Sequence, residues 1–296
     1  MIERLEMFIA LARERHFGRA AAACGVTQPT LSSAIRQLEE SLGVQLVWRG
    51  SRFQGLTPEG QRVLEWARRI VADTRAMRAE MRVARRGLSG NLRLGVIPTA
   101  LAMVADLTGP FCARHPDVRV AILSRSSAEI LAQIEALEID AGITYLEGEP
   151  LGRVEAVPLY RERHMLLVSA ESATARRAEV GWADLAGEPL CLLTSDMQNR
   201  RIVDRHLAAA DAAGPAPRLE SNSIVALVSH VAQGGWSSVL PGRMAELFTA
   251  DARLRAVPIA GADHSVGLIT APRSPHTPLL EALIGAARAV GAAQDQ

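Results

Sequence analysis

The 296-residue sequence has no lysine, only three cysteines and no apolar run near the roughly 18 residues that a membrane-spanning helix needs. Its opening residues mix apolar and charged side chains, without the apolar segment or the small-residue cleavage site of a secretory signal. We therefore expect a cytoplasmic protein without a membrane partner. Cys24, Cys112 and Cys191 are odd in number and far apart, which indicates packed thiols in a reducing compartment and excludes a disulfide framework.

Motifs for catalysis and for metal binding are also missing. The seven histidines are dispersed, without the H-E-x-x-H spacing of a zinc site. No G-x-S-x-G elbow, P-loop or G-x-G-x-x-G turn occurs. The paired carboxylates Glu39 and Glu40 lie at the exposed end of an expected helix, where we expect solvent to cover them. The sequence therefore predicts a protein that is not an enzyme and that binds no cofactor or metal.

The charges that are present are unevenly distributed. Residues 1–90 carry 15 arginines and 9 acidic residues, whereas residues 91–296 carry 18 arginines and 23 acidic residues. A basic first part before an acidic second part predicts that the first contacts phosphates and that the second has another task. The length suits two or three domains.

The first sixty residues show the spacing of a helix-turn-helix. Apolar residues at helical intervals predict a first helix, and an Ala-rich helix over 18–23 ends before Gly25. Thr27 is placed to cap the next helix, with Pro29 in its first turn, and that helix stops at Gly43. Two helices joined by a short Gly-containing turn are typical of proteins that place the second helix in the major groove of DNA.

The residues after this motif predict a wing and a long helix. Residues 44–56 read as a small β-hairpin with a basic tip, and Thr57 and Pro58 start a helix as N-cap and first helical residue. Along this helix the apolar spacing alternates between three and four, which indicates pairing with a second copy of the chain. Packing on the chain's own domain is the alternative. The expected dimerisation residues are Val63, Ala67, Ile70, Thr74, Met77, Met81, Ala84 and Leu88.

The second part of the chain alternates between strands and helices. Strands near 92–96 and 141–143 with helices between them predict a parallel sheet that is covered by helices. An apolar stretch over 154–168 leads into a second set of strands and helices. Residues 264–271 and a helix over 278–290 are expected to return to the first set. We therefore predict two α/β lobes that are joined by two crossing strands and hinged about a cleft.

A constellation of residues in the first part resembles one known family. It consists of Ala20-Ala21-Ala22, Gly25-Val26-Thr27-Gln28-Pro29-Thr30-Leu31-Ser32, Ile35, Leu38-Glu39, Leu42-Gly43 and Leu56-Thr57-Pro58-Glu59-Gly60. The pattern is similar to that of the LysR-type transcriptional regulators of bacteria, closely over residues 2–60 and more loosely as far as Val231–Pro241. The resemblance implies a winged helix-turn-helix, a dimerising linker helix, a two-lobed effector domain like a type 2 periplasmic binding protein, and a dimer of dimers.

The expected fold class is therefore α/β, with an all-α winged helix-turn-helix and a long linker helix before two Rossmann-like α/β subdomains. The DNA-binding domain is expected over residues 1–58, the linker over 59–88 and the effector domain over 91–296. The first lobe of the effector domain is expected over about 91–161 and 268–296, and the second over about 162–267.

The N-terminal end of the recognition helix is the part that a helix-turn-helix presents to base edges. Gln28 can form a bidentate pair with adenine, and the Pro29 ring and the Thr30 methyl group can touch thymine methyl groups. Plain capping is the alternative. Ser33 departs from the family, which often has a basic residue there, so that Arg36 and the wing arginines would supply the charge for phosphates. The expected DNA-binding residues are Thr27, Gln28, Pro29, Thr30, Ser32, Ser33, Arg36, Arg49 and Arg52.

Helix starts that follow strands predict an effector site between the lobes. Pro98 and Thr99 follow the first strand, at the carboxyl end where α/β sheets bind ligands, and Ser126 has capping-box spacing with a later glutamate. Asn199 and Asn222 are expected to open helices of the second lobe, whose N–H groups and dipoles suit a small anion. The resemblance places Thr99 and the region of Ser126 in the pocket. The expected effector-binding residues are Pro98, Thr99, Ala100, Ser126, Ser127, Asn199 and Asn222; capping alone is the alternative for each.

The sequence thus predicts a DNA-binding regulator whose action on a promoter dyad responds to a small anionic effector, such as a carboxylate. Its expected partners are double-stranded DNA, the effector and further copies of the chain, with RNA polymerase as another candidate. Three alternatives stay open: an effector-independent repressor, a cytoplasmic solute-binding protein, and an α/β enzyme with a DNA-binding appendage. Trp236 stands where the family usually has a small residue, and either narrows the cleft or packs between the lobes.

Overall fold

The computed structural model describes residues 1–48, 53–212, 217–261, 263–273 and 275–294, without the side chains of residues 82 and 84–86. The chain divides into two compact units. The N-terminal unit consists mainly of residues 1–87, and the C-terminal unit mainly of residues 88–134, 139–274 and 279–296. Within the described residues, no helix combines the length and the apolar character that crossing a membrane demands.

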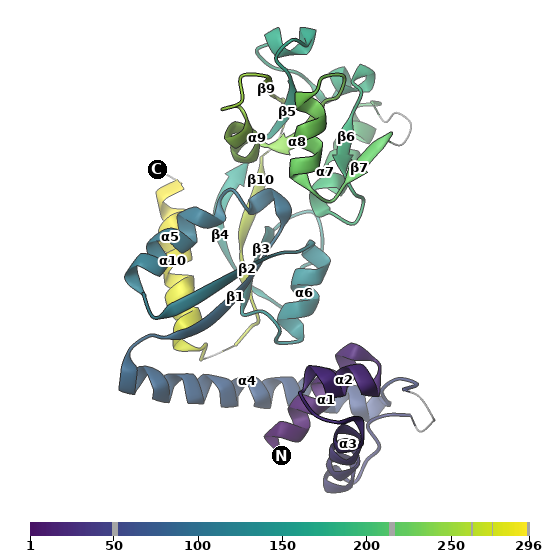
Figure 1. The fold of residues 1–296 in the computed structure, drawn as a ribbon, viewed down its shortest axis with the longest axis vertical. Helices are drawn as coiled ribbons and strands as arrows, with labels where there is room; N and C mark the ends of the chain where they lie inside the picture. The colour runs from purple at the N-terminus through teal and green to yellow at the C-terminus, as the bar shows by residue number, and fades with distance from the viewer. Residues whose placement is uncertain (49–52, 213–216, 262, 274, 295–296) are drawn as a thin grey trace. The chain divides into compact units, whose positions relative to one another are not determined.

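Three helices form the core of the N-terminal unit: α1 (Ile2–Glu14), α2 (Phe17–Ala23) and α3 (Gln28–Leu42), as Figure 1 shows. Their apolar faces meet around fully buried side chains such as Phe8 and Leu38. Burial of a side chain of this size contributes about 1.5–3 kcal/mol. Gly25 adopts a φ of 67° in the turn between α2 and α3, which glycine reaches without steric cost. The predicted helix-turn-helix is confirmed.

The wing is described at its base. Val47 and Leu56 pair in an antiparallel bridge, and the Trp48 amide donates to the Gly55 carbonyl over 3.1 Å. The predicted basic tip at 49–52 lies outside the described residues. The two sides of the expected hairpin are therefore paired where they leave and rejoin the helical core.

The long helix α4 (Pro58–Arg86) begins as its sequence predicts. Thr57 is the N-cap, and its hydroxyl accepts a hydrogen bond from the Gly60 amide over 2.9 Å. Gly60 is required because a Cβ there would lie 2.1 Å from the Leu46 carbonyl oxygen. The motif from Thr57 to Gly60 therefore serves both to start the helix and to let the wing lie directly against it.

The first lobe of the C-terminal unit contains a five-stranded sheet in the order β2-β1-β3-β10-β4. Its strands are β1 (Gly90–Val96), β2 (Val118–Ser124), β3 (Ala141–Tyr145), β4 (Glu155–Glu162) and β10 (His264–Thr270). The strands β1, β2 and β3 are parallel, whereas β10 is antiparallel to both β3 and β4. The predicted parallel sheet is confirmed for β1, β2 and β3, and β10 returns from the second lobe to this sheet, as expected, in the antiparallel direction.

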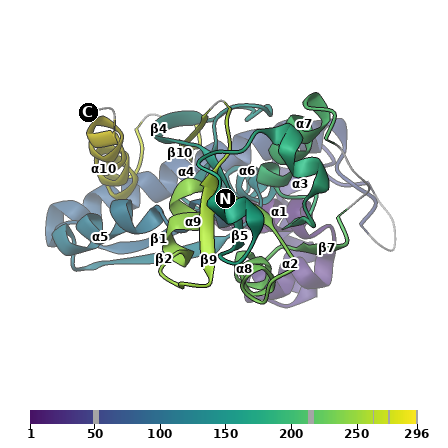
Figure 2. The same ribbon diagram turned by 90° about the horizontal axis from the view of Figure 1, so that it is seen from above.

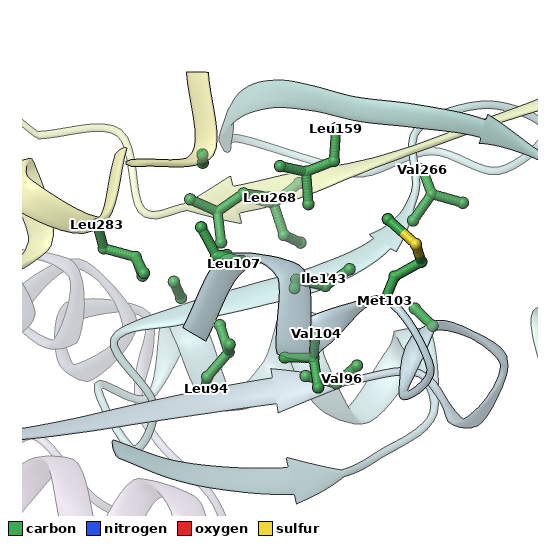
Figure 3. Close-up of a cluster of buried hydrophobic side chains, with 14 of the residues drawn as sticks. Leu94, Val96, Met103, Val104, Leu107, Ile143, Leu159, Val266, Leu268 and Leu283 are labelled. Carbon is green, nitrogen blue, oxygen red and sulfur yellow. The ribbon is translucent and has the colours of Figure 1, made fainter. Parts of the chain in front are cut away.

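Helices cover both faces of this sheet (Figure 1). One face carries α5 (Val104–Arg114) and α10 (Pro278–Gln294); the other carries α6 (Ser127–Glu135). Figure 3 shows Leu107 of α5 and Leu283 of α10 directed toward side chains of the strands. On the opposite face, a Cβ on Gly142 would lie 2.2 Å from Ile130, so that glycine allows α6 to approach the sheet closely. Between β1 and β2 the chain forms a 3-10 turn (Pro98–Ala100) and then α5.

The second lobe has two smaller sheets. β5 (His164–Ser169) pairs antiparallel with β8 (Ser238–Pro241) and β9 (Leu254–Pro258), and β6 (Cys191–Leu193) pairs in parallel with β7 (Leu219–Ser221). The helices are α7 (Gln198–Ala209), α8 (Ile224–Ala232) and α9 (Gly242–Phe248), of which α8 and α9 contact β5 (Figures 1 and 2). The chain crosses between the lobes from β4 to β5 and from β9 to β10. The predicted fold class, a winged helix-turn-helix with a long helix before two α/β lobes, is confirmed.

Candidate functional site

The N-terminal end of α3 is exposed and is capped by its own side chains. Thr27 Oγ1 accepts a hydrogen bond from the Thr30 amide over 3.4 Å, and the two threonine hydroxyls lie 2.9 Å apart. Gln28 and Pro29 are exposed beside them. The cap engages the hydroxyls and leaves the Gln28 carboxamide, the Pro29 ring and the Thr30 methyl group at the surface, so that capping and contact with bases are compatible here.

The exposed side of α3 continues past the expected residues. Ser33 and Arg36 are exposed, and Ser32 is half-buried. Gln37, which sequence reasoning missed, is exposed and donates to Ser33 Oγ over 3.2 Å. Its position four residues after Ser33 is the signal that could have identified it, because residues at that spacing share one side of a helix.

The start of α2 adjoins the start of α3. A Cβ on Gly18 would lie 3.6 Å from Gln28 Oε1. His16 caps α2, and its Nδ1 accepts from the amides of Gly18 over 3.1 Å and Arg19 over 3.3 Å. The exposed Arg19 side chain pairs with Glu14 over 3.6 Å. Arg19, which sequence reasoning did not include, thus follows the glycine that lies near Gln28, and its own side chain contacts Glu14.

Arg49 and Arg52 were expected to supply the positive charge of the wing, and both lie outside the described residues. At the base of the wing, the structure contradicts the expectation that solvent covers Glu39. Glu39 is half-buried instead of solvated, and its Oε1 accepts from the amides of Leu46 over 2.8 Å and Val47 over 3.3 Å. A carboxylate that accepts two backbone N–H groups holds the strand of the wing against the end of α3.

The expected dimerisation residues, from Val63 to Leu88, follow one another along α4 and just beyond its end, and are called here the α4 stripe. The first of them lie inside the N-terminal unit. Ala67 is fully buried and Val63 is partly buried, both against the unit's own core. At this end the stripe therefore packs on its own domain, which was the alternative. At the other end, the side chain of Ala84 lies outside the described residues, and Leu88 follows the helix and packs on the core of the first lobe.

The middle of the stripe is exposed. Ile70, Met77 and Met81 are 40%, 58% and 57% exposed, and Trp66 nearby on α4 is 62% exposed. Thr74 is half-buried, and its hydroxyl donates to the Ile70 carbonyl over 2.8 Å. Large apolar side chains are not usually left exposed in a row, so this part of α4 has the composition of a helix–helix interface.

The expected effector residues of the first lobe are buried. Pro98, Thr99 and Ala100 form the 3-10 turn that follows β1. Ser126 caps α6: its amide donates to Glu129 over 2.8 Å, and its hydroxyl accepts from the Glu129 amide over 3.3 Å. The capping box that the spacing predicts is therefore present, and Ser126 is satisfied within its own helix.

Three polar side chains meet where α6, β3 and α7 come together. Ser127 Oγ donates to Gln198 Oε1 over 2.6 Å, and Thr144 Oγ1 donates to Ser127 Oγ over 2.9 Å. Gln198 Nε2 donates to the Glu147 carbonyl over 3.2 Å. Ser127 was expected in the site, whereas Thr144 and Gln198 were missed. They are fully buried, and neither spacing nor a motif connects them.

A second group of polar side chains adjoins these three. Asn199 Nδ2 lies 2.9 Å from the Tyr145 hydroxyl and 3.0 Å from His164 Nε2. The Tyr145 hydroxyl donates to Glu162. Thr99 lies beside the same hydroxyl. Together these buried residues form what we call the interlobe polar cluster: Thr99, Ser127, Thr144, Tyr145, Glu162, His164, Gln198 and Asn199.

Burial keeps the titratable members of this cluster uncharged. It raises the pKa of Glu162 to about 8, although the hydrogen bond from Tyr145 and the neighbouring Tyr160 hydroxyl act to lower it. Burial, together with two neighbouring histidines, lowers the pKa of His164 to about 3. At neutral pH Glu162 is therefore protonated and His164 neutral, and both take part as hydrogen-bonding groups.

The two arginines that follow Asn199 are already paired. Arg200 is buried, and its Nε lies 2.8 Å from Asp204 while its Nη1 also contacts Glu220. Arg201 binds Glu149 with two nitrogens, over 2.6 and 2.8 Å. These pairs hold the cations against carboxylates of the protein, and Arg201 lowers the pKa of Glu149.

Two other residues lie away from the cluster. Asn222 is exposed in the turn before α8 and does not join the buried residues that were expected with it. Trp236 packs on the core of the second lobe and lines a cavity of about 430 Å³ there, together with Leu190 and Leu207. The expectation that Trp236 narrows the cleft receives no support from this position.

The cysteines differ in environment. Cys191 on β6 is fully buried, and burial raises the pKa of its thiol to about 11. Cys24 is half-buried and Cys112 is exposed, so that packing of all three thiols is not what the structure shows. Within the described residues, no three or more His, Cys, Asp or Glu side chains group in a way that could hold a metal ion.

Comparisons with known proteins agree with both units. Residues 2–61 match the family of bacterial regulatory helix-turn-helix proteins of the lysR family, and residues 85–292 match the LysR substrate binding domain. A hydrogen peroxide-inducible genes activator from Pectobacterium carotovorum is 35% identical over 193 residues, which cover 65% of this chain and 64% of that protein. A probable hydrogen peroxide-inducible genes activator from Mycobacterium avium is 31% identical over 78% of this chain and 73% of that protein. The chain thus spans less than two thirds of the first relative.

Solved structures of similar fold cover nearly the whole chain. A full-length OxyR variant from Pseudomonas aeruginosa matches with a TM-score of 0.73 and 25% identity, over 97% of each chain. Full-length CbnR in complex with its target DNA matches with a TM-score of 0.60 over 98% of this chain and 99% of that one; at 22% identity this likeness concerns the fold alone.

Proposed function

The chain belongs to the LysR family of bacterial transcriptional regulators, and we propose that it changes its hold on promoter DNA when a small molecule binds between the two lobes of its C-terminal unit. The observation that carries this proposal is the interlobe polar cluster. It combines side chains from both lobes at the carboxyl ends of strands, where α/β sheets bind ligands. A ligand there contacts both lobes at once, and therefore favours one arrangement of the lobes over another.

The chemistry of the cluster favours a small polar effector such as a carboxylic acid or its anion. Its donors are hydroxyl groups and the Asn199 amide, and the neighbouring arginines Arg200 and Arg201 are held by carboxylates. Such a set recognises the oxygen atoms of a ligand by hydrogen bonds and needs no ion pair. The start of α7 adds the positive end of a helix dipole.

A thiol-based response to peroxide, which the names of the relatives raise, is not supported here. Oxidation requires an accessible thiolate, and Cys191, the only cysteine in the sequence of the second lobe, is buried with a raised thiol pKa. Cys112 is exposed, but it is the only cysteine of the first lobe, so neither lobe contains a pair for a disulfide. We propose reversible, non-covalent binding of the effector.

In this proposal the DNA-binding residues are the expected Thr27, Gln28, Pro29, Thr30, Ser32, Ser33 and Arg36, with Arg49 and Arg52 on the wing. Two copies of the chain pair through the exposed part of α4, and read the two halves of a dyad in the cytoplasm. A dimer of dimers, and contact with RNA polymerase during activation, are further parts of the same proposal. The exposed Ile70, Met77 and Met81 support the pairing.

A screen of the full-length protein tests the proposal against its alternatives. We expect at least one of a panel of small carboxylates, carboxamides and inorganic anions to raise the melting temperature and to change the affinity for promoter DNA in a mobility-shift titration. Stabilisation by none of them would favour an effector-independent repressor. Ligand binding without any affinity for DNA would favour a solute-binding protein, and turnover of the ligand an enzyme.

A further inference from the structure

One side chain of the second lobe ends among groups of the first. Gln198 is the first residue of α7, yet its carboxamide oxygen accepts from Ser127 Oγ on α6 over 2.6 Å and lies 3.4 Å from Thr144 Oγ1 on β3. Its amide nitrogen donates to the Glu147 carbonyl, which follows β3, over 3.2 Å. The carboxamide therefore belongs to one lobe and makes its hydrogen bonds with the other.

These hydrogen bonds are the ones that a bound small molecule would make. Ser127, Thr144 and Gln198 are 3%, 0% and 3% exposed, so that their polar atoms depend on one another instead of on water. An acceptor oxygen of a ligand at the Gln198 position would satisfy the same hydroxyls. Without such an acceptor the Ser127 hydroxyl would be buried with an unmet donor, which is unfavourable.

We propose, on the basis of the proposed function, that Gln198 is an internal occupant of the effector site. Its carboxamide takes the place of the effector's head group and ties the lobes together until an effector displaces it. The effector that competes best carries both an acceptor oxygen for Ser127 and a donor for the Glu147 carbonyl. A carboxamide or a protonated carboxylic acid has both, whereas a carboxylate lacks the donor.

Chemical rescue of Gln198→Ala in the full-length protein tests this inference. The substitution removes one methylene and the carboxamide, a group that acetamide replaces almost atom for atom. We expect the melting temperature of the C-terminal unit to fall by about 3–6 °C, because one or two buried hydrogen bonds are lost. We expect 100 mM acetamide to restore at least half of this loss, equimolar acetate to restore less, and neither to stabilise the unsubstituted protein.

Gln233→Ala is the matched control, since Gln233 is an exposed glutamine of the same lobe. We expect it to change neither the melting temperature nor the response to acetamide. Equal stabilisation of all three proteins by acetamide, or an unchanged melting temperature in Gln198→Ala, would overturn the inference. A larger effect of acetate than of acetamide would overturn the assignment of a head group with a donor.

A second variant keeps the inference testable if Gln198→Ala does not fold. Gln198→Met retains the volume of the side chain and loses its hydrogen bonds, so we expect a folded protein that acetamide does not stabilise and that releases the lobes more readily. Small-angle scattering should then show a larger radius of gyration; an unchanged radius and melting temperature would count against the inference that Gln198 holds the two lobes together.

These readouts use neither DNA nor the natural effector. Rescue by acetamide without any effect of small molecules on DNA binding would reject the proposed function and retain the inference. An effector that binds the unsubstituted protein and Gln198→Ala equally well would reject the inference and retain the proposed function.

Discussion

The start of α3 and the interlobe polar cluster are both rich in hydroxyl and amide groups, but they use these groups in opposite ways. At α3 the side chains of Gln28, Thr30 and Ser33 are exposed, and water satisfies whatever they do not bond locally. In the cluster, Ser127 and Gln198 are buried and bond to each other. Exposed polar groups add little to the free energy of folding and are available to a partner at once. Buried ones stabilise the fold, and a ligand reaches them only by replacing a bond that already exists.

The largest effect is expected for an exposed apolar residue of α4. Because an exposed side chain adds little to folding, the comparison predicts that its substitution weakens assembly and leaves the fold intact. Met77→Asp would place a carboxylate in the proposed seam of α4, where it loses water on pairing. We expect the dimer dissociation constant to rise about 100-fold, equivalent to about 2.7 kcal/mol, with an unchanged free energy of unfolding of the monomer. Sedimentation equilibrium measures this. Arg78→Gln, also on an exposed part of α4, is the control. An unaltered dimer would place the interface elsewhere.

The second prediction concerns the pH dependence of stability in the buried region. The folded pKa of Glu162 is about 8 against an ordinary 4.5, so the folded protein keeps a proton that the unfolded chain releases. The stabilising contribution is complete below pH 4.5 and is lost as the pH rises through 8. We expect the free energy of unfolding to fall by about 2 kcal/mol between pH 6.5 and 9 in the unsubstituted protein.

Glu162→Gln removes the titrating group and should flatten this dependence. Urea unfolding of both proteins at the two pH values measures the difference, and the variant corrects for every other group that titrates in the same range. The pH window begins at the ordinary pKa of histidine, so the depressed pKa of His164 changes the free energy of unfolding by only about 0.4 kcal/mol, and it does so equally in both proteins. A slope that is the same in both proteins would show that Glu162 is ionised and paired in solution.

The third prediction concerns the exposed start of α3, where a substitution should change DNA recognition and leave stability unchanged. Gln28→Ala should leave the melting temperature unchanged, because the side chain is exposed. It should reduce the preference for the specific site over its best variant at one adenine by about tenfold, the value of a bidentate contact with a base. Fluorescence anisotropy with the two DNA duplexes measures this preference. Equal weakening on specific and random DNA would assign Gln28 to the phosphates instead.

The smallest effect is expected for a charge on the wing. Arg52→Ala should weaken binding to specific and random DNA alike, by about two- to threefold, and should lower the slope of log affinity against log salt by about one, the value for one phosphate contact. A salt titration of both complexes measures this slope. A change in sequence preference with an unaltered slope would contradict the assignment and move Arg52 from the phosphates to the bases.

Features that depend on short spacing were predictable. The cap at Thr27, the turn at Gly25, the start of α4 at Thr57 and the capping box at Ser126 all follow from residues within four positions of one another. Propensity and local hydrogen bonds decide such features before any tertiary contact forms. The alternation of strands and helices likewise identified two α/β lobes.

The sequence by itself therefore determined the helix-turn-helix, the exposed polar start of α3 and the order of the elements, because these follow from local periodicity and capping. Only the tertiary structure decided which polar residues share a site. Gln198 and Ser127 are 71 positions apart, and Asn222, which looked equivalent to Asn199, lies exposed. It also decided which part of the α4 stripe packs inward. The reason is physical: burial and hydrogen bonding between distant segments depend on how sheets and helices pack in three dimensions, and no local pattern encodes that packing.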